Sequence, residues 1–421
     1  MAIYIYLVVF LAVYAGVAWR NLRVALYLIL MLLPTYLFRL SVWFIPTTLL
    51  ELVIYTAFVV WLVAIFRGRA TFNWLEVKRY LASLGLLAAG LVVGTLISTD
   101  QLVSVGIIKG WFLDPLLLWV MLVSVLERRV HVKKAIIALM ISGVLLSLFA
   151  LYQVVSGDFV TIDDRASALF SSANYLSLYL VPIIILGVGL LLAVHSQKRW
   201  WVVISLILML VALYFSFSYG GWLALVGGIG FLMLITLPWL PTLIGIGVVV
   251  VVGIISQWQH PKFQQMLDLV ERSSSSVRLE VWQTAWLMIR ENYLAGIGLG
   301  LFEQRYPAFV SRLFHPPLEP SMLHAHNVFM QFWINSGLLG LIGFIGVLVT
   351  FFGQIGAAFK SRRHVLTGAV MAAMVALLVH GLIDTPYWKN DLAALFWAIV
   401  AFGIILSQNA TLKRSNLSDR D

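Results

Sequence analysis

Two histidines stand directly before a long apolar segment, in the run HAHNVFMQFWINSGLLG that extends from His324 to Gly340. A neutral imidazole can accept a proton near pH 7, so His326 could act as a general base toward a hydroxyl group. Asn327 follows it, and its side-chain amide could orient the imidazole. A buried structural histidine also fits the pattern, whereas an H-x-H pair alone is weak evidence for a metal site. We therefore predict a general base at His326, supported by His324 and Asn327, and no metal.

Three basic residues outside the main basic clusters could bind an anion. Arg165 lies in DDRASALFSSANYLS, Arg278 in SSSSVRLEVWQTAW, and Lys109 in DQLVSVGIIKGWFLDP. A guanidinium group binds phosphate oxygens through two parallel hydrogen bonds, so converging arginines suit a phosphate or diphosphate.

Each of these residues also has a purely structural interpretation. Arg165 could pair with a neighbouring aspartate and Arg278 with a nearby glutamate; the candidates are Asp163, Asp164, Glu271 and Glu280. Lys109 could simply extend to the membrane surface from an interfacial helix.

The composition places these residues in a membrane protein. The chain has 421 residues, of which 62% are apolar and 11% charged, and its mean hydropathy is +0.98. Apolar runs of about twenty residues recur from end to end, which is typical of membrane-spanning helices and excludes a transmembrane β-barrel. The absence of cysteine excludes disulfides, thiolate chemistry and cysteine-ligated metals.

Thirteen apolar segments predict an all-α polytopic protein with 12–13 transmembrane helices, the short second segment being the uncertain one. They fall near 3–19, 24–38, 46–66, 80–98, 112–126, 135–156, 173–195, 200–218, 222–237, 239–257, 327–353, 366–383 and 392–408. The stretch 101–115 mixes polar, glycine and aromatic residues, and we expect an interfacial or re-entrant helix there.

The net charge of +10 is distributed as in membrane proteins, so nucleic-acid binding is not expected. The basic residues cluster in alternate connections, near 20–23, 67–79, 128–134, 198–199, 360–363 and 413–414. Such clusters mark the cytoplasmic side. Arg165, Arg278 and His326 then face the opposite side.

The spacing of the apolar segments predicts four parts. These are a transmembrane bundle (1–257), a large and partly helical periplasmic loop (258–326), C-terminal transmembrane helices (327–408) and a cytoplasmic tail (409–421). SSSS at 273–276 can cap a helix that starts near Val277.

Four blocks of the chain, between about 160 and 400, resemble the O-antigen ligase family, which is related to O-antigen polymerases. The family signature is His followed by Asn, Ser or Gln, nine residues, Gly, two residues, and Gly, Thr or Tyr; HN followed by nine residues and GLLG is similar to it. RASALFSSANYLS, SVRLEVWQTAWLMIRENYLAGIGLGLF and HGLIDTPYW (380–388) resemble three further family segments.

The resemblance implies a metal-independent, inverting glycosyltransferase of GT-C-like architecture in the bacterial inner membrane, without a cofactor and with its active site facing the periplasm. Its donor would be a glycan on undecaprenyl diphosphate, and its acceptor a lipid A-core sugar or another glycan, among membrane lipids. Carried onto this sequence, His326 would be the general base, and Arg165 and Arg278 would hold the diphosphate. Lys109 is a further candidate for the diphosphate, and the supporting residues would be His324, Asn327, Asn174 and Asp384.

One segment departs from the family pattern. Many relatives carry Ser-Arg-Gly at the outward end of a mid-chain helix, whereas this chain reads SFSYGGW at 216–222, with Tyr219 or Gly220 in place of the arginine. Lys109 could supply the missing charge.

Three alternative functions stay open at this stage. A polymerase of the same superfamily would share the donor chemistry. A transporter or flippase would be expected to show inverted repeats and ionisable groups at mid-membrane, and a non-catalytic scaffold would not need the His-Arg set.

Overall fold

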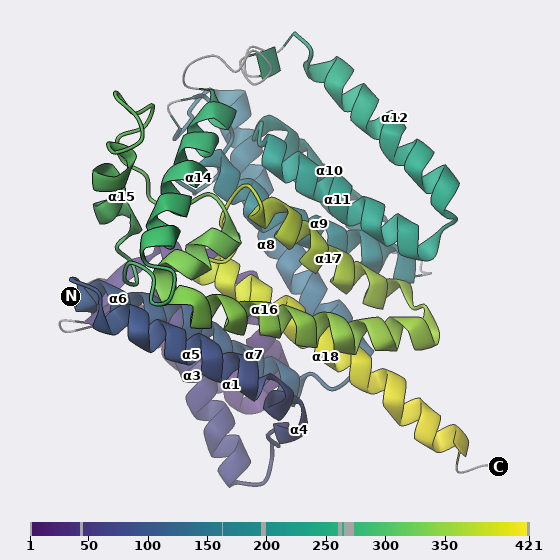
Figure 1. Cartoon of the computed structure of the whole chain (residues 1–421). Helices are drawn as coiled ribbons and strands as arrows, with labels where there is room; N and C mark the ends of the chain where they lie inside the picture. The colour runs from purple at the N-terminus through teal and green to yellow at the C-terminus, as the bar shows by residue number, and fades with distance from the viewer. Residues whose placement is uncertain are drawn as a thin grey trace.

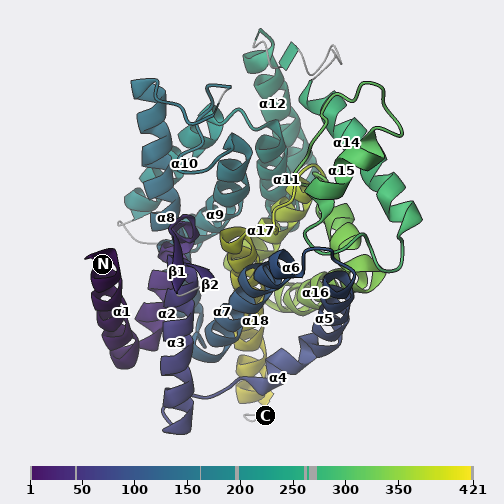
Figure 2. The ribbon, with the colours of Figure 1, turned by 90° about the vertical axis from the view of Figure 1, so that its left-hand side faces the viewer.

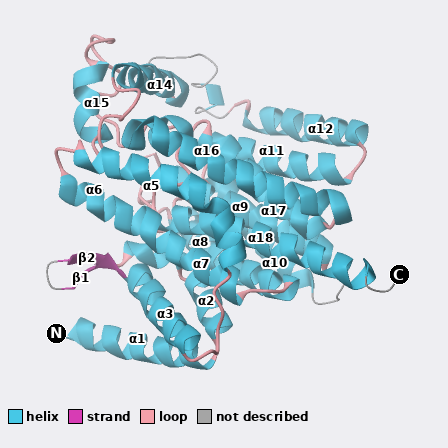
Figure 3. Cartoon of the chain, turned by 60° about the horizontal axis from the view of Figure 1, so that its bottom comes forward, coloured by secondary structure: helices cyan, strands magenta, loops and turns pink. Residues whose placement is uncertain are grey.

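The computed structural model describes residues 2–42, 45–161, 163–194, 199–259, 263–264 and 273–418. Figure 1 shows a bundle of long helices, with α14 and α15 at the opposite end from the C-terminus. Figure 3 shows one short antiparallel hairpin beside this bundle, near the N-terminus.

The helices and strands follow the apolar segments of the sequence. In chain order they are α1 (Ala2–Arg20), α2 (Leu22–Met31), η1 (Leu33–Leu37), β1 (Arg39–Val42), β2 (Ile45–Thr48), α3 (Leu49–Phe66), α4 (Trp74–Val77), η2 (Lys78–Tyr80), α5 (Leu81–Leu96), α6 (Gln101–Ile107), η3 (Ile108–Leu113), α7 (Asp114–Val125), α8 (Arg129–Ser156), α9 (Ala173–Ala193), α10 (Trp200–Phe215), α11 (Tyr219–Thr236), α12 (Trp239–Gln257), α14 (Ser274–Glu291), α15 (Phe302–Val310), α16 (Val328–Arg362), α17 (Val365–Gly381) and α18 (Asn390–Ser418).

The predicted fold class, an all-α polytopic membrane protein, is confirmed. Within the described ranges, nine helices are long and apolar enough to cross a membrane. Four shorter apolar helices, α1, α2, α10 and α17, coincide with the remaining predicted segments.

The stretch 101–115, for which we expect an interfacial or re-entrant helix, is the first part of a longer helical element. Helices α6, η3 and α7 run on from Gln101 to Val125 as a single element of 25 residues, and η3 is a π-helical turn within it. Two of its polar residues contact partners far away in the sequence. Ser104 donates to the carbonyl of Leu299 at 2.7 Å, and Lys109 pairs with Glu51 at 2.7 Å.

Helices α5 and α16 pack through glycines. A Cβ atom on Gly90 of α5 would lie 2.7 Å from the Cα of Gly340, and one on Gly343 of α16 would lie 2.8 Å from the Cα of Leu87. Small residues let membrane helices approach closely, where dispersion contacts and not water exclusion hold them together. The second glycine of the signature therefore fixes α16 against α5.

Helix α16 is broken at Gly337, whose φ of +64° suits glycine. The segment 294–300 satisfies the backbone groups that the break exposes. The amide of Leu338 donates to the carbonyl of Leu294 at 3.0 Å, and the amide of Ile297 donates to the carbonyl of Ile334 at 2.9 Å. The motifs GIGLG and HN–x9–G are thus hydrogen-bonded to each other, and this contact orients the first turns of α16.

Helix α14 lies across the end of the bundle and is packed on α15, as Figures 1 and 2 show. It begins at Ser274, three residues earlier than predicted, because the hydroxyl of Ser273 accepts the amide of Ser276 at 3.1 Å. Its buried face forms a separate small core with Phe302 and Tyr306 of α15. This part of the long polar segment is therefore folded.

Several of the basic connections meet at one end of the bundle. A hollow of about 570 Å³ is lined by Arg20, Arg23 and Arg69, together with Glu127. Lys133 at the start of α8 reaches the carbonyl of Ala193 at the end of α9, at 3.1 Å. This clustering agrees with the charge pattern that predicts the cytoplasmic side.

The glycine packing of α5 predicts the effect of adding a single methyl group. We expect Gly90→Ala to lower the free energy of unfolding by about 1–3 kcal/mol, because the methyl group would press on the backbone of α16. Gly85→Ala is the matched control on the same helix, since a Cβ there meets nothing within 4 Å. The melting temperatures of the two purified variants measure the difference. Equal melting temperatures would show that the close packing does not constrain the two helices.

Candidate active site

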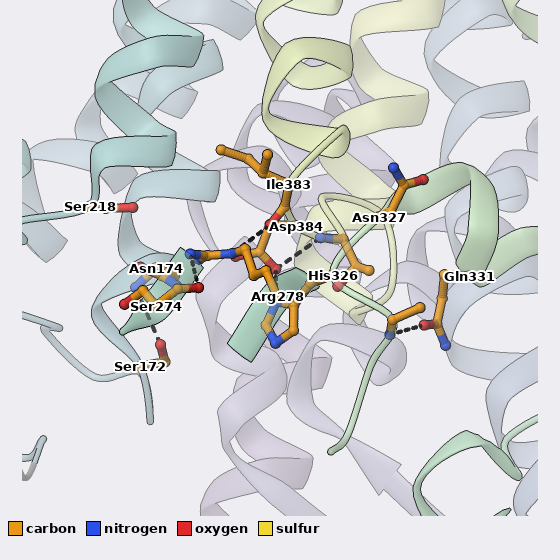
Figure 4. Close-up of polar contacts among 12 residues, drawn as sticks. Ser172, Asn174, Ser218, Ser274, Arg278, His326, Asn327, Gln331, Ile383 and Asp384 are labelled. Atoms are coloured by element: carbon orange, nitrogen blue, oxygen red, sulfur yellow. Dashed lines mark hydrogen bonds and ion pairs between the residues drawn. The ribbon is translucent and has the colours of Figure 1, made fainter. Parts of the chain in front are cut away.

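His326 lies just before α16, with its imidazole against Asp384 in the connection between α17 and α18. Its Nδ1 is 3.4 Å from Oδ1 of Asp384, and Figure 4 shows the two side chains meeting. The backbone of His326 is left-handed, with φ of +47°, which is uncommon for a residue other than glycine. Trp282 holds this backbone by donating from its indole Nε1 to the carbonyl of His326 at 3.0 Å.

Asp384 is buried, with 4% of its surface exposed. Burial on its own would raise the pKa of Asp384, but the contact with His326 and the neighbouring positive charge of Arg278 outweigh it and lower the pKa well below its ordinary value. A carboxylate beside Nδ1 favours the tautomer in which Nδ1 carries the proton. Nε2 then has a free lone pair.

Arg278 contacts the same connection from α14. Its Nε donates to the carbonyl of Ile383 at 3.1 Å, and its Nη1 donates to the carbonyl of Ser274 at 3.2 Å. Burial lowers the pKa of Arg278, and the charge of Asp384 opposes that shift. The remaining terminal nitrogen, Nη2, makes no hydrogen bond to a described residue and is available for an anion.

Pairing of Arg278 with Glu280 is excluded by the structure. Glu280 is buried on another face of α14, where its carboxylate accepts the amides of Leu318 at 2.8 Å and Glu319 at 3.1 Å. Its role is to fix the extended segment that leads toward His326. Glu271, the other suggested partner, lies outside the described residues.

Arg165 is held on all sides in the loop before α9. Its Nε donates to the carbonyl of Ser216 at 2.7 Å, and its Nη2 donates to Oδ1 of Asn174 at 2.9 Å. Its Nη1 pairs with Asp163 at 3.0 Å, so the predicted pairing with an aspartate does occur. Asp163 is half exposed, whereas the arginine side chain is only 12% exposed. The guanidinium is therefore fixed in one orientation with its charge only partly balanced by an exposed partner.

Both arginines line one cavity of about 290 Å³ between α9, α11 and α14. Its lining residues are Arg165, Asn174, Tyr219, Gly220, Leu223, Ser274, Ser275, Arg278, Trp282 and Ile383. The structure thus brings together three residues predicted to act at one site, Arg165, Asn174 and Arg278. Two guanidinium groups that face one cavity make it attractive to an anion.

The cavity wall also contains the segment that departs from the family pattern. Tyr219 and Gly220 begin α11, whose N-terminus is capped by Ser218. A Cβ on Gly220 would lie 2.8 Å from Cδ1 of Ile383 and 3.3 Å from Nε2 of His380. A long side chain at position 220 would therefore push against the turn that holds Arg278.

Lys109 lies away from this cavity. Its Nζ pairs with Oε2 of Glu51 at 2.7 Å and donates to the carbonyl of Pro46 at 2.6 Å. The structure does not bring Lys109 together with the arginines, so its predicted contact with a diphosphate has no geometric support.

Asn327 does not orient the imidazole as expected. Its Oδ1 caps α16 by accepting the amides of Phe329 at 3.0 Å and Met330 at 3.1 Å. Its Nδ2 donates to the carbonyl of Leu382 at 3.0 Å, next to the carbonyl that Arg278 uses. The residue supports the site by tying α16 to the connection after α17.

His324 is packed beside His326 and Asp384. Burial and the nearby His326 lower the pKa of His324 to about 4, so it is neutral in the folded protein. Its Nδ1 is buried and has no hydrogen-bond partner among the described residues. Within the described ranges, no three His, Asp or Glu side chains are grouped so as to hold a metal ion.

Two functional contacts were missed in the sequence. One is Trp282, whose spacing of four from Arg278 places both residues on one side of α14. Gln331 accepts the amide of Ala325 at 2.6 Å and fixes the backbone before His326, which no local pattern indicates.

Residues 204–345 match the family model described as O-Antigen ligase. The chain is also 25% identical over 281 residues to the O-antigen ligase of Salmonella typhimurium (strain LT2), an alignment that covers 62% of this chain and 67% of that protein. About a third of the chain thus resembles the O-antigen ligase family. The family match includes Tyr219, Arg278 and His326, so it spans most of the cavity wall and the histidine beside it.

The lowered pKa of His324 predicts a pH dependence of stability. The unfolded chain binds a proton at this residue near its ordinary pKa of about 6.5, whereas the folded protein does so only near 4. Stability should therefore fall as the pH is lowered from 7 to 4.5, and His324→Phe should make this fall smaller. Melting temperatures of both proteins across that range measure the effect. Parallel curves would show that His324 is not held neutral by the fold.

Proposed function

We propose that the chain is an inverting glycosyltransferase that transfers a glycan from undecaprenyl diphosphate to a hydroxyl of a lipid A-core sugar. The observation that supports this most directly is the His326–Asp384 pair beside a cavity that two arginines line. A base and an anion site in one place are what transfer from a diphosphate requires.

In the proposed step, the acceptor hydroxyl oxygen attacks the anomeric carbon of the donor sugar. The new carbon–oxygen bond forms as the bond from that carbon to the diphosphate oxygen breaks, and the diphosphate leaves with the bonding electrons. The hydroxyl proton passes to Nε2 of His326, and Asp384 stabilises the imidazolium that forms. Direct attack on the face opposite the leaving group inverts the anomeric configuration.

In this proposal, Arg165 and Arg278 stabilise the diphosphate as it leaves. Negative charge builds up on the diphosphate as the bond breaks, and guanidinium groups fixed in place stabilise that charge without having to reorganise. Arg165 is fixed by its three hydrogen-bonded nitrogens, and Arg278 keeps Nη2 available. This arrangement supports a mechanism that needs no metal ion and no cofactor.

The proposed setting is a bacterial inner membrane, with the cavity on the periplasmic side. The basic connections gather at the other end of the bundle, which would be cytoplasmic by the positive-inside rule. A lipid-linked donor could then present its diphosphate at the membrane surface while its lipid stays among the membrane lipids.

The proposal predicts that His326→Ala abolishes glycan transfer, because nothing then removes the hydroxyl proton. Purified protein is reconstituted with an undecaprenyl-diphosphate-linked glycan and core lipid A, and product is measured over time. His315→Ala, at an exposed histidine in the same segment, should transfer at the normal rate. Normal turnover by His326→Ala would remove it as the base.

The same reconstitution separates a ligase from a polymerase of the superfamily. A second lipid-linked unit is offered as acceptor in place of core lipid A. A ligase extends only the core lipid, whereas a polymerase lengthens the lipid-linked chain.

A further inference from the structure

The structure contains a second polar cluster, formed by Glu51 of α3, Lys109 of the π-helical turn η3 and Asn390 at the start of α18. We propose that this cluster positions Asp384 for catalysis by anchoring the far end of the connection 382–389. This inference rests on the proposed function, in which Asp384 orients His326. It gives Lys109 a role that is distinct from holding the diphosphate.

Glu51 is the centre of the cluster and is only 4% exposed. Its Oε2 pairs with Lys109 at 2.7 Å and accepts the hydroxyl of Thr47 at 2.8 Å. Its Oε1 accepts Nδ2 of Asn390 at 3.3 Å. A buried carboxylate in a membrane protein is costly unless it is paired and hydrogen-bonded, so such groups usually have a functional reason.

The π-helical turn η3 also contacts the end of the connection 382–389, next to Asn390. Trp111 donates from Nε1 to Oδ1 of Asn390 at 3.1 Å, and its ring meets that of Trp388 edge-on at 5.8 Å. Phe112, the next residue, contacts the rings of Tyr387 at 5.4 Å and Trp388 at 5.8 Å. π-Helical turns are rare, and they often occur at functional sites.

Asp384 lies between this anchor and the end of α17. On one side, its amide donates to the carbonyl of His380 at 2.9 Å. On the other side, the chain passes through the aromatic contacts of Tyr387 and Trp388 to Asn390. Because the connection is short and held at both ends, displacement of Asn390 should displace Asp384 relative to His326.

Gly110 offers a minimal way to disturb the anchor. A Cβ at this position would lie 2.6 Å from Nδ2 of Asn390 and 3.3 Å from Oε1 of Glu51, so Gly110→Ala must move the amide. Gly106→Ala is the matched control one turn earlier in the same continuous helix, where a Cβ meets nothing within 4 Å. Neither change removes a charge or a hydrogen-bonding group.

We expect Gly110→Ala to lower kcat for glycan transfer by roughly tenfold to a hundredfold, as for a small misplacement of a catalytic group. Gly106→Ala should leave kcat unchanged. The decisive reading is the double-mutant cycle with Asp384→Asn: if the anchor acts through Asp384, Gly110→Ala costs nothing further in that background. Equal kcat for the two alanine variants, or full additivity with Asp384→Asn, would overturn the proposal.

Trp111→Phe is a second variant, for the case that Gly110→Ala fails to fold. It keeps an aromatic ring against Trp388 but removes the donor to Asn390. We expect a smaller loss of kcat that is again absent in the Asp384→Asn background, and an unchanged kcat would also overturn the proposal.

The result also separates this inference from the proposed function. Normal turnover by His326→Ala would contradict the proposed function itself. An inactive His326→Ala protein together with equal Gly110→Ala and Gly106→Ala proteins would contradict only the positioning role of the cluster.

Discussion

The site depends on two backbone carbonyls in the connection directly after α17. A backbone carbonyl away from water needs a hydrogen-bond donor, and a connection between helices offers none from a regular ladder. Here the carbonyls of Leu382 and Ile383 accept side-chain donors from Asn327 and Arg278. These hydrogen bonds tie α14 and the start of α16 to the connection that carries Asp384, beside His326.

Glycines make that meeting possible. Gly337 breaks α16, and the segment 294–300 fills the break with its own amides and carbonyls. Gly340 then allows α16 to lie directly on α5. Gly337 and Gly340 thus act on the orientation of the first turns of α16, which directly follow the histidine.

Much of this arrangement could be predicted from the sequence. Hydropathy located the thirteen apolar segments, because a membrane-spanning helix must be apolar along its length. Arg165 and Arg278 were selected because they lie outside the basic clusters of the other connections. Both line the same cavity in the structure. The resemblance to a family also selected Asp384, although the sequence does not show that it meets Nδ1 of His326.

The predicted roles of Lys109 and Asn327 were wrong for the same physical reason. Each side chain makes a hydrogen bond to a residue that lies far away in the sequence. Lys109 seemed available for a phosphate because nothing near it in the sequence shows its pairing with Glu51, 58 residues away. Asn327 seemed placed to orient an imidazole, but the cap of α16 and the end of α17 use its amide instead. The sequence likewise did not indicate the π-helical turn, because the residues that it contacts lie on α3 and α18.

The central claim is that Asp384 makes His326 a base beside the arginine-lined cavity. The most direct test is the rate of glycan transfer by purified Asp384→Asn, in which the side chain keeps its size but loses its charge. The account predicts a fall of about 100-fold or more, the range attributed to general-base catalysis, in a protein that remains folded. A folded Asp384→Asn protein that transfers glycan at the normal rate would contradict it.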